Sequence, residues 1–163
     1  IVPDHKRGVG FMDVVSITRL NEQYRIIFDS LGRLELQKLD SSQSKFKLCK
    51  IIGKRTMKGG KTQLTFHDGR NQTVDGGKYH VGDVVKMALP EQKITDHYEL
   101  KKGSMIYITG GKHTGDIVEV EDIQRGTVTR EILVSFKKEN NVFATLLDYV
   151  FVLGKGEPAI RLK

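Results

Sequence analysis

A period-two alternation of apolar and polar residues, broken by turn-forming residues at intervals of roughly ten, most constrains the fold of this chain. Segments rich in branched and aromatic residues alternate in this way at 12–17, 24–28, 33–39, 46–52 and 62–66. Such alternation is typical of half-buried β-strands. Glycine-containing turn sequences separate these and later segments at 30–32, 58–61, 67–69, 75–77 and 81–83. We therefore predict an all-β chain of short antiparallel strands, with one helical turn at 41–44 capped by Asp40 or Ser41.

The second half of the chain continues the pattern. Further strands are predicted at 84–89, 93–100, 106–108, 117–120, 130–136, 142–145 and 149–153. Gly103 separates two groups of hairpins, so we predict a central β domain over 10–103 and a second domain with a C-terminal tail over 104–163. About five short strands are enough to form a small barrel, so both domains are predicted to be barrel-like.

The segment 106–120 reads Ile-Tyr-Ile-Thr-Gly-Gly-Lys-His-Thr-Gly-Asp-Ile-Val-Glu-Val. A strand enters a tight turn at Gly110 and Gly111, and Gly115 opens the next strand. This unit resembles the KOW motif of SH3-like barrels in ribosomal proteins and transcription elongation factors. The resemblance implies an SH3-like barrel in the second domain, and a function in binding RNA or an RNA polymerase. The three glycines are predicted to serve backbone geometry. Lys112 and His113 are predicted to contact RNA, and for His113 the alternative is a solvent-facing turn residue without a ligand.

The net charge of +7 and the isoelectric point near 9.5 favour a polyanionic partner. The positive excess lies in the first domain: residues 1–103 hold 19 Lys and Arg against 12 Asp and Glu, whereas residues 104–163 hold 8 of each kind. The densest region is the window 45–61, which contains no acidic residue. Its cations are predicted to contact RNA phosphates, and they are Lys45, Lys47, Lys50, Lys54, Arg55, Lys58 and Lys61. Gly59 and Gly60 are predicted to form the turn at its tip.

Alternation within this window predicts that Lys45 and Lys47 face solvent while Phe46 and Leu48 face the core. After Leu48 the parity changes, since Cys49 and Ile51 become the inward positions and Lys50 points outward. A β-bulge near 48–49 is the simplest structure that satisfies both patterns. The alternative interpretation of the lysines is an edge strand whose charges discourage aggregation between sheets.

Catalytic and metal-binding patterns are weak. His5, His67, His80, His97 and His113 lack metal-ligand spacing, and residues 106–113 lack the glycine and the hydroxyl residue of a phosphate-binding loop. The adjacent pair His67 and Asp68 falls in a predicted hairpin turn, with no activated nucleophile nearby in sequence. We therefore predict no enzyme activity, no metal, no cofactor and no small-molecule substrate.

The location predicted for the chain is intracellular. The single cysteine, Cys49, cannot form an internal disulfide. No apolar run approaches the ~20 residues that span a bilayer, so no membrane partner is expected. The chain begins with Ile1, and charged residues follow at once, so this segment is not a signal peptide and the chain is predicted to be a fragment or a processed product.

Five segments, in order along nearly the whole chain, resemble one protein family: 10–17, 45–51, 94–96, 109–111 and 143–156. The family is ribosomal protein S-four of the e-type, found in the small subunit of archaea and eukaryotes. The resemblance implies a structural component of the cytoplasmic ribosome that binds small-subunit ribosomal RNA (rRNA) and neighbouring ribosomal proteins. Family members carry another RNA-binding domain upstream, so residues 1–9 are predicted to be its remnant. The alternative function is a KOW-type protein-interaction module of a transcription elongation factor.

Overall fold

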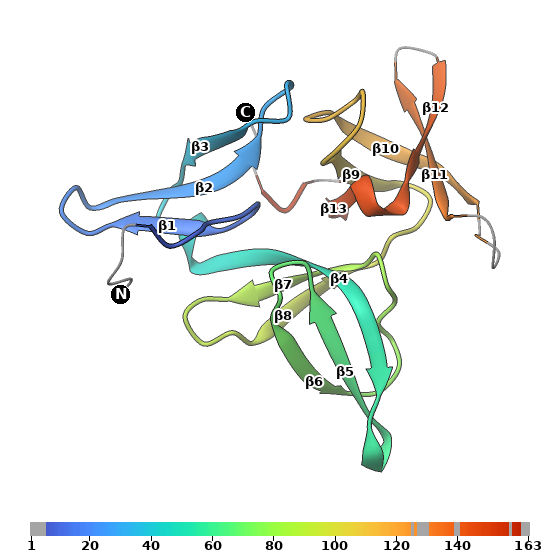
Figure 1. Ribbon diagram of the computed structural model, residues 1–163, viewed down its shortest axis with the longest axis horizontal. Helices are drawn as coiled ribbons and strands as arrows, with labels where there is room; N and C mark the ends of the chain where they lie inside the picture. The colour runs from blue at the N-terminus through green and yellow to red at the C-terminus, as the bar shows by residue number, and fades with distance from the viewer. Residues whose placement is uncertain (1–5, 125, 127–130, 139–140, 157, 161–163) are drawn as a thin grey trace.

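The computed structural model describes residues 6–124, 126, 131–138, 141–156 and 158–160. These residues form strands β1 to β13, three short 3-10 turns and no α-helix, so the all-β prediction is confirmed. No helix among them is long and apolar enough to cross a membrane. The strands form three antiparallel sheets, which Figure 1 shows as separate curled layers. Residues 1–5 of the predicted upstream remnant lie outside the described residues, as do 130, 139 and 140 of the predicted strand pair near 130–145.

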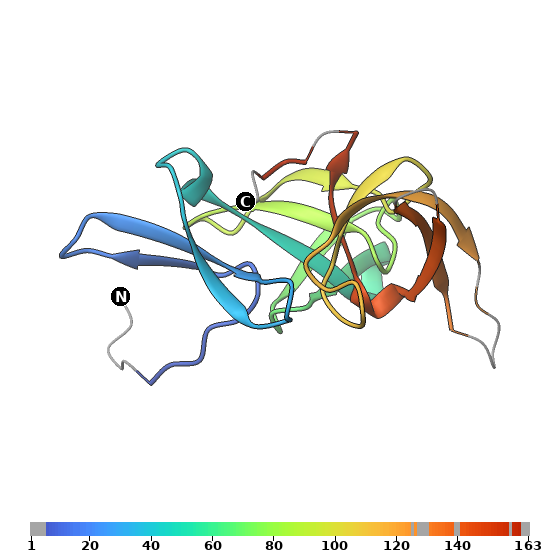
Figure 2. The same ribbon diagram turned by 90° about the horizontal axis from the view of Figure 1, so that it is seen from above.

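The first sheet is a three-stranded meander in the order β1-β2-β3. Its strands are β1 (Val14–Ile17), β2 (Glu22–Phe28) and β3 (Leu34–Lys38). Both views show it at the left, in blue, with the orange strands of the C-terminal sheet at the right (Figures 1 and 2). The chain then makes the 3-10 turn η1 (Gln43–Lys45), which overlaps the predicted helical turn by two residues.

The central sheet has the order β6-β5-β4-β7-β8. Its strands are β4 (Phe46–Thr56), β5 (Lys61–Phe66), β6 (Asn71–Asp75), β7 (Val84–Ala88) and β8 (Ile94–Tyr98). The long strand β4 has two partners, because its first half pairs with β7 and its second half pairs with β5. The second half therefore extends away from β7, and the 3-10 turn η2 (Lys58–Gly60) closes the β4–β5 hairpin.

The third sheet has the order β12-β11-β10-β9-β13 and contains the KOW-like segment as β9, a loop and β10. Its strands are β9 (Ser104–Ile108), β10 (Ile117–Gln124), β11 (Leu133–Lys138), β12 (Asn141–Leu146) and β13 (Val150–Lys155). The 3-10 turn η3 (Leu147–Tyr149) joins the last two strands. The predicted hairpins of the second half of the chain are therefore present, and β9 begins directly after Gly103.

Two apolar cores lie on opposite faces of β4. Leu48 belongs to a large core shared with the third sheet, whereas Cys49 and Ile51 belong to a smaller core within the central sheet. Because both faces of the strand are covered, successive apolar residues need no change of register. The bulge predicted near 48–49 is wrong: pairing with β7 is continuous from Phe46 to Lys50, and the irregularity lies farther along, opposite β5.

The first and third sheets are held together by aromatic side chains. The ring of Phe11 stacks on Phe28 at a centroid distance of 5.0 Å and on Tyr107 at 5.7 Å. The Tyr107 hydroxyl donates a hydrogen bond to the Phe28 carbonyl. Met12 is fully buried in the large core, so the segment before β1 also contributes to this junction.

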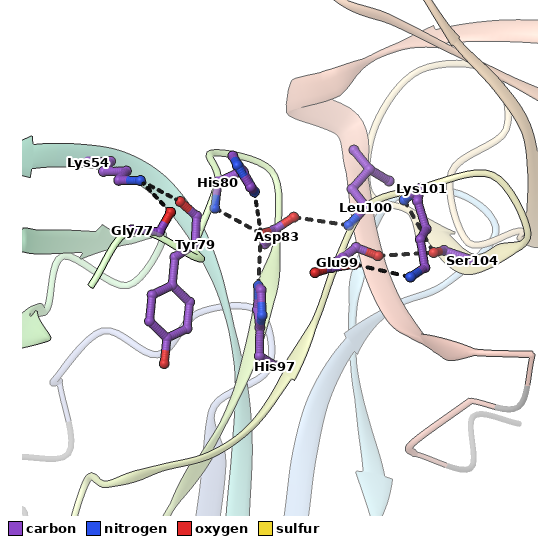
Figure 3. Close-up of polar contacts among 10 residues, drawn as sticks. All are labelled: Lys54, Gly77, Tyr79, His80, Asp83, His97, Glu99, Leu100, Lys101 and Ser104. Carbon is purple, nitrogen blue, oxygen red and sulfur yellow. Dashed lines mark hydrogen bonds and ion pairs between the residues drawn. The ribbon is translucent and has the colours of Figure 1, made fainter. Parts of the chain in front are cut away.

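A buried carboxylate fixes the connection between the central and third sheets. Asp83 accepts hydrogen bonds from the backbone N–H groups of His80 (2.8 Å) and Leu100 (3.0 Å), and its Oδ2 lies 2.8 Å from His97 Nε2 (Figure 3). These partners precede β7, end β8 and lead into β9. Asp83 therefore holds the two sheets in a defined relation at the point where the chain passes between them.

Candidate nucleic-acid interface

The β4–β5 hairpin carries four of the predicted RNA-binding cations to the surface. It projects from the central sheet at the bottom of Figure 1. Lys54, Arg55, Lys58 and Lys61 are all exposed. Gly59 and Gly60 have φ values of +79° and +73°, a left-handed conformation that favours glycine, so the tight tip depends on these residues. We call the four cations the hairpin cluster.

The ammonium group of Lys54 is held in place without being neutralised. Its Nζ donates hydrogen bonds to the carbonyls of Gly77 (3.1 Å) and Tyr79 (2.9 Å), as Figure 3 shows. Backbone carbonyls carry no net charge, so Lys54 stays a fixed cation at the base of the hairpin. Asp75 lies opposite Lys61 in the β5–β6 register, but no ion pair joins them among the described residues.

Lys47 does not face solvent, and the sequence prediction of its orientation is wrong. Its side chain is 2% exposed, and Nζ donates to Asp13 Oδ1 (2.7 Å) and Asp68 Oδ2 (2.6 Å). Burial lowers the pKa of Lys47, but the hydrogen bonds to Asp13 and Asp68 outweigh it and raise that pKa above its ordinary value. Lys47 is therefore the centre of a buried ionic cluster. Lys45, two residues earlier, is exposed as predicted.

Lys50 is also buried, on the opposite face of β4, and the prediction that it points outward is wrong. Its Nζ donates to the carbonyls of Leu147 (2.7 Å) and Asp148 (3.0 Å) in η3. Burial lowers the pKa of Lys50 to about 8. The third sheet covers this face of the strand, so Lys50 ties the central sheet to η3 and does not reach a ligand.

The stability of the chain should depend on the titration of Lys50. The pKa of Lys50 is about 8 in the folded chain against an ordinary value of 10.5, so the unfolded chain binds more protons between these pH values. The contribution of Lys50 to unfolding free energy therefore rises from pH 8 to 10.5. We expect the unfolding free energy of the unaltered chain, minus that of Lys50→Met, to increase by on the order of 2 kcal/mol over this window. Urea denaturation at several pH values measures this increase. If the unfolding free energies of the two chains change equally with pH, the prediction is contradicted.

The loop between β9 and β10 depends on three glycines, for reasons of space, of backbone conformation, or of both. A Cβ atom on Gly110 would lie 2.6 Å from the ring of Tyr149, so a side chain there has no space. Gly111 has a φ of +85°, in the left-handed region. Gly115 has a φ of +89°, and a Cβ there would lie 2.9 Å from the Asp29 carbonyl oxygen. Each of the three positions therefore lacks either the space or the backbone conformation for an ordinary side chain.

The two predicted RNA contacts in this loop differ in exposure. Lys112 is exposed and has no ion pair with the described residues. The His113 side chain is only 21% exposed, and its Nδ1 lies 3.3 Å from Asp116 Oδ2. The His113 ring packs on Phe143 at a centroid distance of 4.5 Å. The His113 side chain therefore packs against its own sheet, whereas Lys112 is exposed to solvent.

His67 and Asp68 have separate structural partners. His67 Nδ1 accepts a hydrogen bond from the Lys50 N–H (3.1 Å), and Nε2 lies 3.2 Å from the Phe11 carbonyl, the partner of a donated N–H. Asp68 instead binds Lys47. Burial lowers the pKa of His67. Both nitrogens of His67 are thus occupied by the backbone, and the pair does not form an acid–base dyad.

Sequence reasoning missed two aromatic residues beside the KOW-like loop. Tyr149 is 41% exposed and lies against Gly110, and Phe143 packs on His113. Both were interpreted only as strand residues. The sequence contains one signal: two adjacent glycines leave room for an aromatic ring to pack against the backbone. The separation between positions 110 and 149 does not indicate that these residues meet.

Comparison with known proteins identifies the family. The family model described as Ribosomal family S4e matches residues 20–94. Small ribosomal subunit protein eS4 of Methanothermobacter thermautotrophicus is 45% identical over 161 residues, covering 98% of this chain and 66% of that protein. The protein of the same name from Methanococcus vannielii is 41% identical over 167 residues, covering 98% of this chain and 68% of that protein. The chain thus spans about two thirds of the length of these relatives.

A solved structure shares the fold. The crystal structure of the 30S ribosomal protein S4e from Thermoplasma acidophilum matches with a TM-score of 0.81 and 33% sequence identity, covering 90% of this chain and 73% of that chain. These relatives are ribosomal proteins, and they give no support to the alternative of an elongation-factor module. Sequence identity, coverage and fold agree, and the chain therefore belongs to the S4e family of ribosomal proteins.

Proposed function

We propose that this chain is a structural component of the small ribosomal subunit in the cytoplasm, and that it binds small-subunit rRNA through the hairpin cluster. The observation that carries the proposal is the exposure of Lys54, Arg55, Lys58 and Lys61 on a projecting hairpin without an acidic residue in its window. Neighbouring ribosomal proteins are the other expected partners. Lys47 and Lys50 are left out of this interface because they are buried.

The chemistry of the hairpin cluster suits a folded RNA backbone. Lysine ammonium groups contact phosphates as point charges, and the planar guanidinium of Arg55 can bind two oxygens at once. Such contacts fix position and recognise the shape of a helix, with little reading of base sequence. The carbonyl bonds of Lys54 hold one of these charges in place before binding, which reduces the entropy lost on contact.

Binding to small-subunit rRNA fragments should weaken steeply with salt. If each of the four cations neutralises one phosphate, the slope of log K against log salt concentration is about −3 to −4. The variant with Lys54→Gln, Arg55→Gln, Lys58→Gln and Lys61→Gln should lose most of this slope and roughly tenfold or more in affinity near physiological salt. Filter binding or fluorescence anisotropy over a salt series measures both quantities.

A matched control removes four charges elsewhere. Arg19, Arg33, Lys93 and Lys102 are exposed and scattered over other elements, so their replacement by glutamine gives the same net charge. We expect this variant to keep most of the affinity and slope. If the two variants lose equal affinity, the loss is due to overall net charge, and the proposed contact at the hairpin is contradicted. Affinity indifferent to salt would contradict phosphate binding itself.

A further inference from the structure

An open groove of about 370 Å³ lies beside the KOW-like loop, between that loop, β12 and η3. Its lining is mainly apolar and aromatic. The residues used in the argument below are Gly110, Lys112, His113, Phe143 and Tyr149. None of these elements belongs to the hairpin cluster, so the groove is a second, independent surface of the chain.

Backbone contacts fix one wall of the groove. The N–H of Thr109 donates to the Tyr149 carbonyl at 2.8 Å, and the Thr109 hydroxyl donates to the same oxygen at 3.1 Å. Because Gly110 has no side chain, the Tyr149 ring lies directly against the loop. Tyr149 is nevertheless 41% exposed and lines the groove, so this residue is accessible to a ligand there.

Aromatic packing fixes another part of the groove lining. Phe143 stacks on Phe136 at a centroid distance of 5.8 Å and lies 4.5 Å from the His113 ring. Asp116 Oδ2 lies 3.3 Å from His113 Nδ1, and Lys138 Nζ pairs with the same carboxylate at 2.6 Å. The Asp116 carboxylate is thus paired with a cation of the chain itself, which reduces its repulsion of an anion bound near Lys112.

The combination of an aromatic groove and a free cation matches one nucleotide of a single-stranded RNA segment. A nucleobase can stack on the exposed tyrosine ring, and the adjacent phosphate can bind the ammonium group of Lys112. We propose that this groove receives one unstacked nucleobase of the rRNA, with Lys112 on a neighbouring phosphate. The inference rests on the proposed function, since it assumes that rRNA is the partner. A protein side chain in the groove is the alternative occupant that the experiment must exclude.

Substitution of Tyr149 tests the stacking contact. Loss of one base–aromatic stack corresponds to a loss of affinity of about 5- to 150-fold. We expect Tyr149→Leu to show this loss for small-subunit rRNA fragments, and Tyr149→Phe to retain the affinity because it keeps the ring. Val142→Ala, at an exposed position of β12 that does not line the groove, is the matched control and should bind normally. Circular dichroism and thermal unfolding verify that each variant folds.

The salt dependence separates this site from the hairpin cluster. Stacking releases no counterion, so Tyr149→Leu should lower the affinity at unchanged slope of log K against log salt. Lys112→Gln should reduce the magnitude of the slope by about one. Ultraviolet crosslinking of the complex, followed by mass spectrometry, should link a nucleotide to Tyr149 or Phe143.

Three outcomes decide the proposal. If Tyr149→Leu binds RNA as well as the unaltered chain, the nucleobase site is overturned while the proposed function stands. If RNA affinity is unchanged but Tyr149→Leu fails to join small subunits in reconstitution, the groove binds a protein and the proposal is likewise overturned. If the unaltered folded chain binds no rRNA fragment, both the proposed function and this inference fail together.

Discussion

Lys47→Met should lower the unfolding free energy by about 3 kcal/mol. The substitution keeps a side chain of similar length but removes the cation that lies between Asp13 and Asp68. Two carboxylates would then face each other, and Asp68 is mostly buried, with its side chain 11% exposed. We expect the lower end of the usual range of 3–5 kcal/mol, because Asp13 is 32% exposed and Arg70 Nε lies 3.4 Å from Asp68.

Two controls make this prediction sharp. Lys45→Met changes the same residue type two positions earlier, where the side chain is exposed, and should alter stability by less than about 0.5 kcal/mol. Adding Asp13→Asn and Asp68→Asn to Lys47→Met should restore much of the loss, since replacing a whole buried ionic cluster is far less costly than removing one member. Chemical denaturation measures all three variants. Equal stability of the two single variants would mean that Lys47 is solvated, as strand alternation alone predicts.

The orientation of Lys47 and Lys50 shows where sequence reasoning stops. Alternation correctly places β4 as a strand, because period two is a local property of the backbone. It assumes, however, that one face of the strand is solvated. Leu48 and Cys49 belong to different cores, so both faces are covered in the first half of β4. The elements that cover these two faces are formed by residues far away in sequence. A local sequence pattern therefore does not predict the burial of Lys47 and Lys50.

The same reasoning explains why the hairpin tip was easier to predict. Beyond Gly53, β4 pairs with β5 alone and extends away from β7, and its cations Lys54 and Arg55 are exposed. Turn chemistry at Gly59 and Gly60 is encoded locally, and both residues adopt the positive φ values that a tight turn requires. The cations of β4 are therefore exposed where the strand is peripheral and buried where it is central.

The aromatic groove is a further case of long-range assembly. Gly110 and Tyr149 meet because β9 pairs with β13, which brings η3 against the loop. The sequence shows a glycine pair and an isolated tyrosine. Only the strand order brings the tyrosine ring into contact with the glycines. The KOW-like segment was thus sufficient to predict a strand, a loop and a strand, but not the surface that these elements form with the end of the chain.

Gly115→Ala should lower the unfolding free energy by about 3 kcal/mol, through two separate effects. An alanine in the left-handed region at φ +89° costs about 1–2 kcal/mol. Its Cβ would also lie 2.9 Å from the Asp29 carbonyl oxygen and 3.1 Å from Ser30 Cα, and overpacking against backbone costs about 1–3 kcal/mol more. The β2–β3 turn cannot easily yield, because the Asp29 side chain accepts hydrogen bonds from the N–H groups of Leu31 and Arg33.

The matched control for this prediction is Gly59→Ala, at a similar φ of +79° but with no atom within 4 Å of the added Cβ. It should cost only the conformational part, about 1–2 kcal/mol. The excess loss in Gly115→Ala then measures the contact between the KOW-like loop and the β2–β3 turn. Equal losses by urea denaturation would show that the two elements do not touch. A clear excess would mean that this glycine joins the first and third sheets, a structural reason for its place in the motif that is independent of RNA.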